Sequence, residues 1–102
     1  MDELVLITCI VQRGKADKVV KESLTAGAEG ATVFYGRGTG VREKLGLLGK
    51  IITPEKEIIL IVAKRNCSDT VFDAIVKSGK LQEPGQGFIF TQKVAKAVGF
   101  LG

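Results

Sequence analysis

The sequence predicts an α+β domain of the ferredoxin-like type, with the chain order βαββαβ. Two observations carry this prediction: short apolar, β-branched runs typical of strands, and two stretches in which apolar residues recur at the helical period. A chain of 102 residues has room for one hydrophobic core. We therefore expect residues 1–102 to form a single domain.

The first half of the chain predicts a strand, a helix and a second strand. Residues 4–11 read LVLITCIV, a continuous apolar run typical of a strand buried on both faces. Residues 15–26 change to the helical period, and Gly27 is expected to end this helix in a left-handed conformation. Residues 31–35 predict the second strand. The apolar stripe of the helix is expected to comprise Ala16, Val19, Val20 and Leu24.

The second half begins with a long glycine-rich loop over residues 36–54, since charges alternate there without a steady period. Residues 56–63 predict the third strand and residues 88–94 the fourth. Between them, Ser68 is expected to cap a second helix that Gly79 ends. The buried stripe of that helix is expected to comprise Val71, Phe72, Ile75 and Val76.

The predicted sheet is apolar on both faces. Two helices can cover only one face of a four-stranded antiparallel sheet, yet residues 4–11 and 58–62 are apolar at both parities. Leaving these large side chains in water costs about 25 cal/mol for each Å² of apolar surface that stays exposed. We therefore expect the second face to be buried by self-association, sheet against sheet.

Composition narrows the function classes. The chain has no histidine, no metal-ligand spacing, and no GxSxG, Walker or paired-carboxylate motif, so we expect neither an enzyme nor a metal site. The net charge is +4, and no more than two Lys or Arg residues are consecutive. Basic residues dispersed in this way do not favour nucleic-acid binding. No apolar stretch predicts membrane insertion, and residues 1–12 predict a strand, not a signal peptide. Cys9 and Cys67 are expected to be reduced structural thiols of a cytoplasmic protein.

Three segments together carry a resemblance to a known family. They read ATVFYGRGTG (31–40), KEIILIVAKRNCSDTVFDAIVKSGKL (56–81) and EPGQGFIFTQKV (83–94). In this order the chain resembles the PII nitrogen-regulatory signalling proteins from about residue 4 to 98. The resemblance implies a homotrimer whose sheets face a common centre, with an adenine nucleotide (ATP, ADP or AMP) in each cleft between subunits. It further implies signal transduction in nitrogen or carbon metabolism through a regulated partner, such as a transporter or a metabolic enzyme.

Carried over by position, the nucleotide-binding residues are those of two glycine segments. Glycine lets the backbone approach an anion closely, and neighbouring amides can form an anion nest. Phe88 stands where the family has a lysine, so a mono- or diphosphate, or bicarbonate, is an alternative ligand. The expected contacts are Gly36, Arg37, Gly38 and Thr39 in the first segment and Gly85, Gln86 and Gly87 in the second. Further anion contacts are expected from Lys64, Arg65 and Lys80, for which plain surface charge is the alternative.

The long loop is expected to dock a partner protein through Arg42, Lys44, Leu45, Leu47 and Leu48. Two other classes share the chain order. A metal- or anion-binding trimer similar to the divalent-cation-tolerance family is the first alternative. An RNA-recognition module is the second; it would need Phe88 and Phe90 as stacking platforms, although the other central strands carry aliphatic residues.

Overall fold

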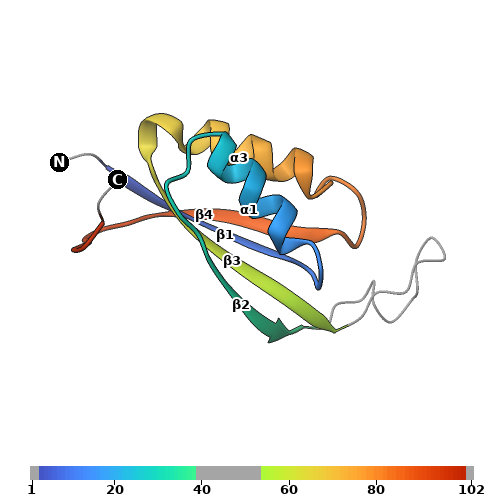
Figure 1. Cartoon of the computed structure of the whole chain (residues 1–102). Coiled ribbons are helices and arrows are strands. Elements are labelled where there is room, and N and C mark those ends of the chain that lie inside the picture. The colour runs from blue at the N-terminus through green and yellow to red at the C-terminus, as the bar shows by residue number, and fades with distance from the viewer. Residues whose placement is uncertain (1–2, 39–53, 101–102) are drawn as a thin grey trace.

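The computed structural model describes residues 3–38 and 54–100. The strands are β1 (Leu4–Gln12), β2 (Thr32–Arg37), β3 (Glu55–Lys64) and β4 (Gly87–Lys93), and the helices are α1 (Ala16–Thr25) and α3 (Arg65–Ser78). Both helices lie on the same side of the sheet (Figure 1). The predicted ferredoxin-like βαββαβ fold is confirmed.

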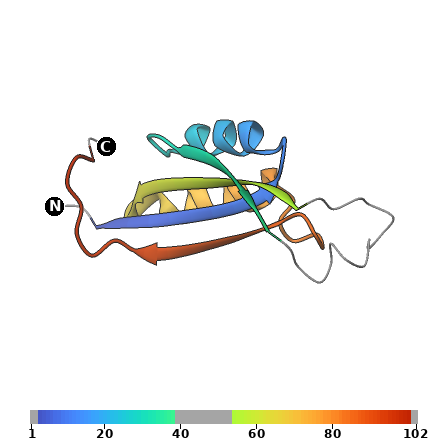
Figure 2. The same cartoon turned by 90° about the horizontal axis from the view of Figure 1, so that it is seen from below.

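The four strands form one antiparallel sheet in the order β2-β3-β1-β4. Ile7 pairs with Ile61 and Cys9 with Ile59 across the central strands. Seen from below, strands β1 and β3 lie in front of helix α3 (Figure 2). The sheet therefore has one face covered by helices and one face without a helix.

The core lies between the helices and the sheet. Strand residues of alternate parity point into it, and six of those from β1 and β3 are at most 2% exposed. The helices close the core from the other side with Val19, Val71 and Ile75, which are equally buried. The strand residues of this core are Ile7, Cys9, Val11, Ile59, Ile61 and Ala63.

Helix α1 ends at the predicted glycine, but its buried stripe differs from the prediction. Gly27 has φ +122°, and the amide of Ala28 donates to the carbonyl of Ser23 at 2.9 Å, a Schellman ending. Leu24 was expected inside and is 44% exposed, whereas Ser23 is fully buried. Here α1 comes close to α3, since a Cβ on Gly27 would lie 3.7 Å from the Cβ of Cys67. The small Ser23 fits this approach, and its hydroxyl donates to the Val20 carbonyl at 2.7 Å.

Helix α3 begins three residues before the predicted cap. Its N-cap is Lys64, in an extended conformation, and the Ser68 hydroxyl donates to the Arg65 carbonyl inside the first turn. The prediction of Ser68 as the cap is therefore wrong, because the strand runs directly into the helix. Gly79 ends the helix as predicted, although the left-handed residue is Lys80, with φ 53°.

Strand β2 is longer than predicted. Gly36 and Arg37 belong to the strand and pair with Lys56 and Glu55 of β3, so the loop does not begin at residue 36. The amide of Gly38 then donates to the carbonyl of Pro54 at 2.9 Å and closes the base of the connection. Six residues of the expected site lie outside the described residues, namely Thr39, Arg42, Lys44, Leu45, Leu47 and Leu48.

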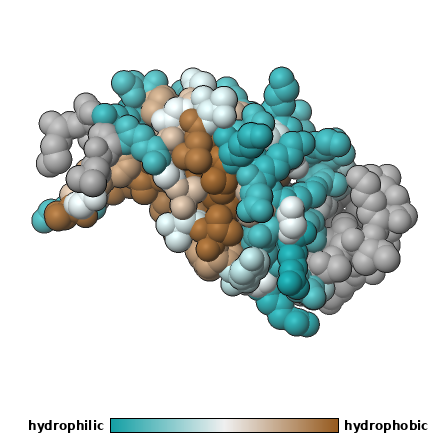
Figure 3. All heavy atoms as spheres, viewed as in Figure 1, coloured by the Kyte–Doolittle hydropathy of each residue, from teal (hydrophilic) through white to brown (hydrophobic). Residues whose placement is uncertain are grey.

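The helix-free face of the sheet is apolar, as the sequence predicts. We call this face, made by the strand residues whose parity is opposite to the core, the open face. Phe88 and Phe34 on this face are 62% and 46% exposed, and the rings of Phe88 and Phe90 lie 5.5 Å apart. In the view of Figure 3, hydrophobic residues reach the surface in a band across the middle of the molecule. The open face comprises Leu4, Leu6, Thr8, Ile10, Gln12, Thr32, Phe34, Gly36, Lys56, Ile58, Leu60, Val62, Lys64, Phe88, Phe90 and Gln92, and its polar residues other than Thr8 lie near the strand ends.

Within the described residues, neither helix has the length and apolar character needed to cross a membrane.

Candidate functional site

The two glycine segments lie at the same end of the sheet but on opposite edges. In an antiparallel sheet, the ends of β1 and β2 lie beside the starts of β3 and β4. Gly36 and Gly38 therefore lie at the β2 edge, and Gly85 and Gly87 at the β4 edge, with β3 and β1 between them. The β2 and β4 edges are three strand spacings apart, which is roughly 14 Å. A single chain does not join the two segments into one pocket.

The segment Gly85 to Gly87, which we call the glycine turn, requires glycine at both ends. Gly85 has φ +77° and Gly87 has φ +152°. A Cβ on Gly87 would lie 2.4 Å from the carbonyl oxygen of Ile10, which no real side chain tolerates. The turn is thus pressed against the end of β1. This close approach supports the predicted need for glycine here.

Gln86 faces the protein interior and not the solvent. It is 8% exposed, and its Oε1 accepts a hydrogen bond from Nζ of Lys15. Beside it, Nε2 of Gln12 donates to the carbonyl of Gly85 at 3.3 Å. The connection between β1 and α1 therefore holds the glycine turn at two points.

At the β2 edge, the lack of a side chain at Gly36 allows close packing against Ile58. A Cβ on Gly36 would lie 2.5 Å from Cδ1 of Ile58, so a side chain there would displace part of the open face. The amide of Gly38 is already donated to Pro54. The side chain of Arg37 is exposed at the edge of the sheet, where it can reach a ligand.

Two buried charged residues at this end were not among the predicted site residues. Lys56 and Glu57, adjacent in β3, are 8% and 7% exposed. Oε1 of Glu57 accepts hydrogen bonds from the amides of Gly14 at 2.6 Å and Ala16 at 3.0 Å, at the start of α1. The sequence carries a faint signal for this role, since Glu57 has the core parity of Ile59 and Ile61 and α1 lacks an acceptor side chain at its N-cap.

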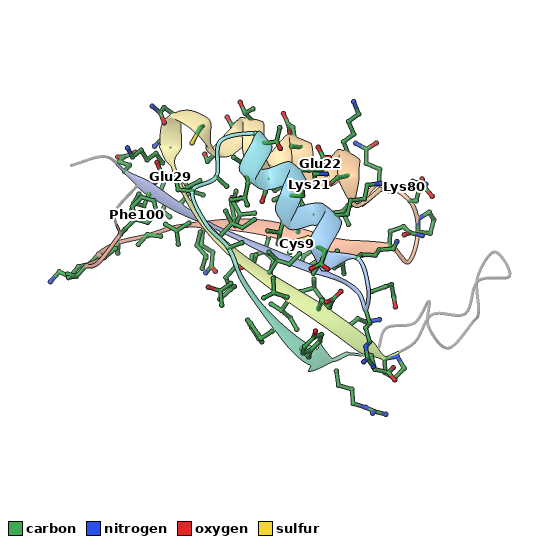
Figure 4. All side chains as sticks on the ribbon, in the orientation of Figure 1. Cys9, Lys21, Glu22, Glu29, Lys80 and Phe100 are labelled. Atoms are coloured by element: carbon green, nitrogen blue, oxygen red, sulfur yellow. The ribbon has the colours of Figure 1, made fainter. Side chains whose placement is uncertain are left out.

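The three cations predicted as anion contacts do not come together. Lys64 and Arg65 lie at the start of α3 and Lys80 beyond its end, a separation of about 21 Å along a 14-residue helix. Arg65 pairs with Glu3 at 2.7 Å, which lowers the pKa of the Glu3 carboxyl. Lys80 lies close to the glycine turn in sequence, and its carbonyl accepts the amide of Glu83 at 3.0 Å. Figure 4 places Lys80 at the end of the molecule opposite Glu29 and Phe100.

Two cavities lie at the far end of the sheet, away from the glycine turn. One, of about 640 Å³, lies between the start of α3 and β4 and is lined by Arg65, Phe72 and Lys93 among others. The other, of about 700 Å³, lies beside the open face between Leu60 and Phe100. Neither was predicted, because each is formed by segments distant in the sequence.

The cysteines and carboxylates of the described residues supply no metal centre. No three His, Cys, Asp or Glu side chains cluster in the part of the chain that the structure describes. Both cysteines are free thiols. Burial raises the pKa of the Cys9 thiol to about 12, so this thiol stays protonated and inert near neutral pH.

Comparison with known proteins identifies a family and a similar solved structure. Residues 4–100 match the family model described as nitrogen regulatory protein P-II. The chain is also similar to a solved structure of PII from Arabidopsis thaliana bound to citrate, at 25% sequence identity and a TM-score of 0.68. This match covers 91% of this chain and 78% of the Arabidopsis chain. No curated protein sequence matches the chain.

Proposed function

Because this chain belongs to the nitrogen regulatory protein P-II family, we propose that it is a non-enzymatic regulator built as a homotrimer of single-domain subunits. In this proposal it binds an adenine nucleotide between subunits and acts in the cytoplasm on a partner protein, such as a transporter or a metabolic enzyme. The proposal rests on the family match and on the arrangement of the sheet.

The observation that carries the proposal is the apolar open face. Phe34, Leu60 and Phe88 belong to three different strands, yet all point to the side that no helix covers. Large apolar side chains left in water on one continuous face favour association at about 25 cal/mol per Å². Closed association of like faces would bury this surface in every copy.

Association also supports an effector site between subunits. Within one chain, the two glycine segments lie on opposite edges of the sheet, so each offers only part of a site. An edge of one subunit beside an edge of another would bring such segments together. The glycine turn is suited to an anion at Gly85, where φ is +77° and the backbone has no side chain that would hinder close approach.

Partner control is assigned to the connection between β2 and β3. Gly38 and Pro54 close its base through one backbone hydrogen bond, at the same end of the sheet as the proposed effector site. An effector bound there can favour one conformation of this connection over another. The leucines at 45, 47 and 48 would supply the apolar contacts to the partner.

Calorimetric titration of the protein with ATP, ADP and AMP tests the effector class. We expect saturable binding of at least one nucleotide, with one site per chain. Citrate belongs in the same titration, because the Arabidopsis PII structure carries this tricarboxylate. Binding of citrate with no response to any nucleotide at millimolar concentration would replace the nucleotide by a carboxylate anion as the effector.

A further inference from the structure

We infer that Lys15 and Glu57 are positioning residues that hold the glycine turn and connect it to the base of the β2–β3 connection. This inference rests on the proposed function, since it assigns these residues to the same effector site. We call the hydrogen bonds of Glu57 with Gly14 and Ala16, together with that of Lys15 with Gln86, the Glu57–Lys15 link.

The first part of the link is a buried carboxylate that caps a helix from another element. Lys15 is the N-cap of α1, but a lysine has no acceptor for the orphan amides of the first turn, and no side-chain cap is present. Glu57 of β3 supplies that acceptor to Gly14 and Ala16. A buried carboxylate is costly unless it is hydrogen-bonded, so this contact fixes where the backbone of Lys15 lies.

The second part is the side chain of Lys15. A cation at a helix N-terminus is unfavourable, because the helix dipole is positive there. The helix therefore gives no reason for a lysine at this position. The reason lies in the glycine turn, where Nζ of Lys15 donates to the buried Oε1 of Gln86. This contact also brings a positive charge to the turn that we assign to an anionic effector.

A further contact extends the link to the opposite edge of the sheet. The amide of Arg13 donates to the carbonyl of Glu55 at 3.3 Å, and the preceding Pro54 accepts the amide of Gly38. The β1–α1 connection is thus bonded on one side to the strand that begins at the loop base. On its other side it is bonded to the glycine turn. A displacement of the turn by a ligand would be transmitted through these bonds and not across open solvent.

Amide hydrogen exchange of the ligand-free protein tests the link without any assumption about the effector. In Lys15→Met the chain keeps its length but loses the charged donor, and we expect exchange at Gln86 to Phe88 to become at least about tenfold faster. Lys18→Met, an exposed position on α1, is the matched control and should leave this segment unchanged. Unchanged exchange of the turn in Lys15→Met, or equal acceleration across the whole sheet, would overturn the inference.

Two variants of Glu57 separate positioning from simple loss of stability. Glu57→Gln keeps an oxygen acceptor for the two amides, so we expect exchange at Gly14 to Ala16 and at the turn close to that of the wild type. Glu57→Ala should accelerate both segments. If the glutamine variant behaves like the alanine variant, the hydrogen bonds to Gly14 and Ala16 are not what positions the turn.

Titration with ADP then connects the link to the effector site. We expect Lys15→Met to bind ADP about tenfold more weakly than the wild type and Lys18→Met to bind it equally well. If the wild type binds none of ADP, ATP and AMP, the nucleotide part of the proposed function fails, while the exchange experiment still decides the link. If the wild type binds and Lys15→Met binds equally well, the link does not serve this site.

Discussion

The two faces of the sheet are similar in composition and different in environment. On the helix side, Ile59 and Ile61 are completely buried, whereas on the open face Phe34 and Phe88 keep about half or more of their surface exposed. Both sets arise from the same sheet by simple alternation along its strands. The chain thus covers one face by itself, and the other face has the character of an interface.

The largest expected effect comes from placing a charge on the open face. Leu60→Lys should reduce the association constant of the oligomer by at least about a thousandfold, because an unpaired ammonium would be buried between subunits. Sedimentation velocity measures the change. Leu24→Lys replaces a leucine that is 44% exposed on α1, and as a matched control it should leave the oligomer intact. Equal behaviour of the two variants would contradict the difference between the faces.

The neighbouring position probes the covered face. Ile61→Ala removes a fully buried side chain from the core and should lower the free energy of unfolding by about 2–5 kcal/mol, through lost burial and a cavity. Urea unfolding measures this loss. Oligomers of the folded variant should persist, since Ile61 points away from the open face. A loss of assembly without a loss of stability would reverse the assignment of the two faces.

A smaller effect is expected at the glycine turn, where the two faces end. Gly87→Ala should lower the free energy of unfolding by about 1–3 kcal/mol, because a Cβ would meet the carbonyl of Ile10 in a backbone conformation that alanine rarely adopts. Thermal unfolding measures the change. Gly30→Ala is the control, since nothing lies within 4 Å of its added Cβ. Equal stability of the two variants would show that the turn does not need glycine.

The smallest expected effect is a pH dependence from the covered face. The Cys9 thiol has its pKa raised by burial to about 12, so folding keeps it neutral where the unfolded chain would ionise it. Its contribution to stability is complete below about pH 9 and falls as the pH rises towards 12, by about 1 kcal/mol near pH 10. Unfolding of the wild type and Cys9→Ala at pH 8 and pH 10 measures this. Parallel pH dependence in both proteins would mean that the thiol is accessible to water.

The sequence predicted the fold well because its signals are local. Continuous apolar runs identified β1 and β3, and Gly27 and Gly79 ended the helices as expected. The errors also have local causes. Ser68 is a common cap residue, but β3 leads into α3 without a break, and the edge strand β2 extended through Gly36 because pairing with Lys56 overrides its low strand propensity.

The candidate site could be predicted only in part. The Gly-x-Gly spacing at residues 85 and 87, just before the last strand, is visible in the sequence. The side-chain hydrogen bonds around this turn are not, because they join residues 41 to 73 positions apart. Nothing in the sequence pattern links Lys15 to Gln86 or Glu57 to Gly14, since each pair forms only when the sheet brings its strand ends together. The grouping of Lys64, Arg65 and Lys80 does not occur within a chain, because a whole helix separates the first two from the third.

Sedimentation equilibrium of the wild-type protein at micromolar concentration tests the central claim most directly. We predict a species of about 33 kDa, three copies of the 10.9 kDa chain, that persists on tenfold dilution. A stable species with the mass of one chain would show that the open face stays exposed to solvent in a monomer. An effector site between subunits would then be ruled out.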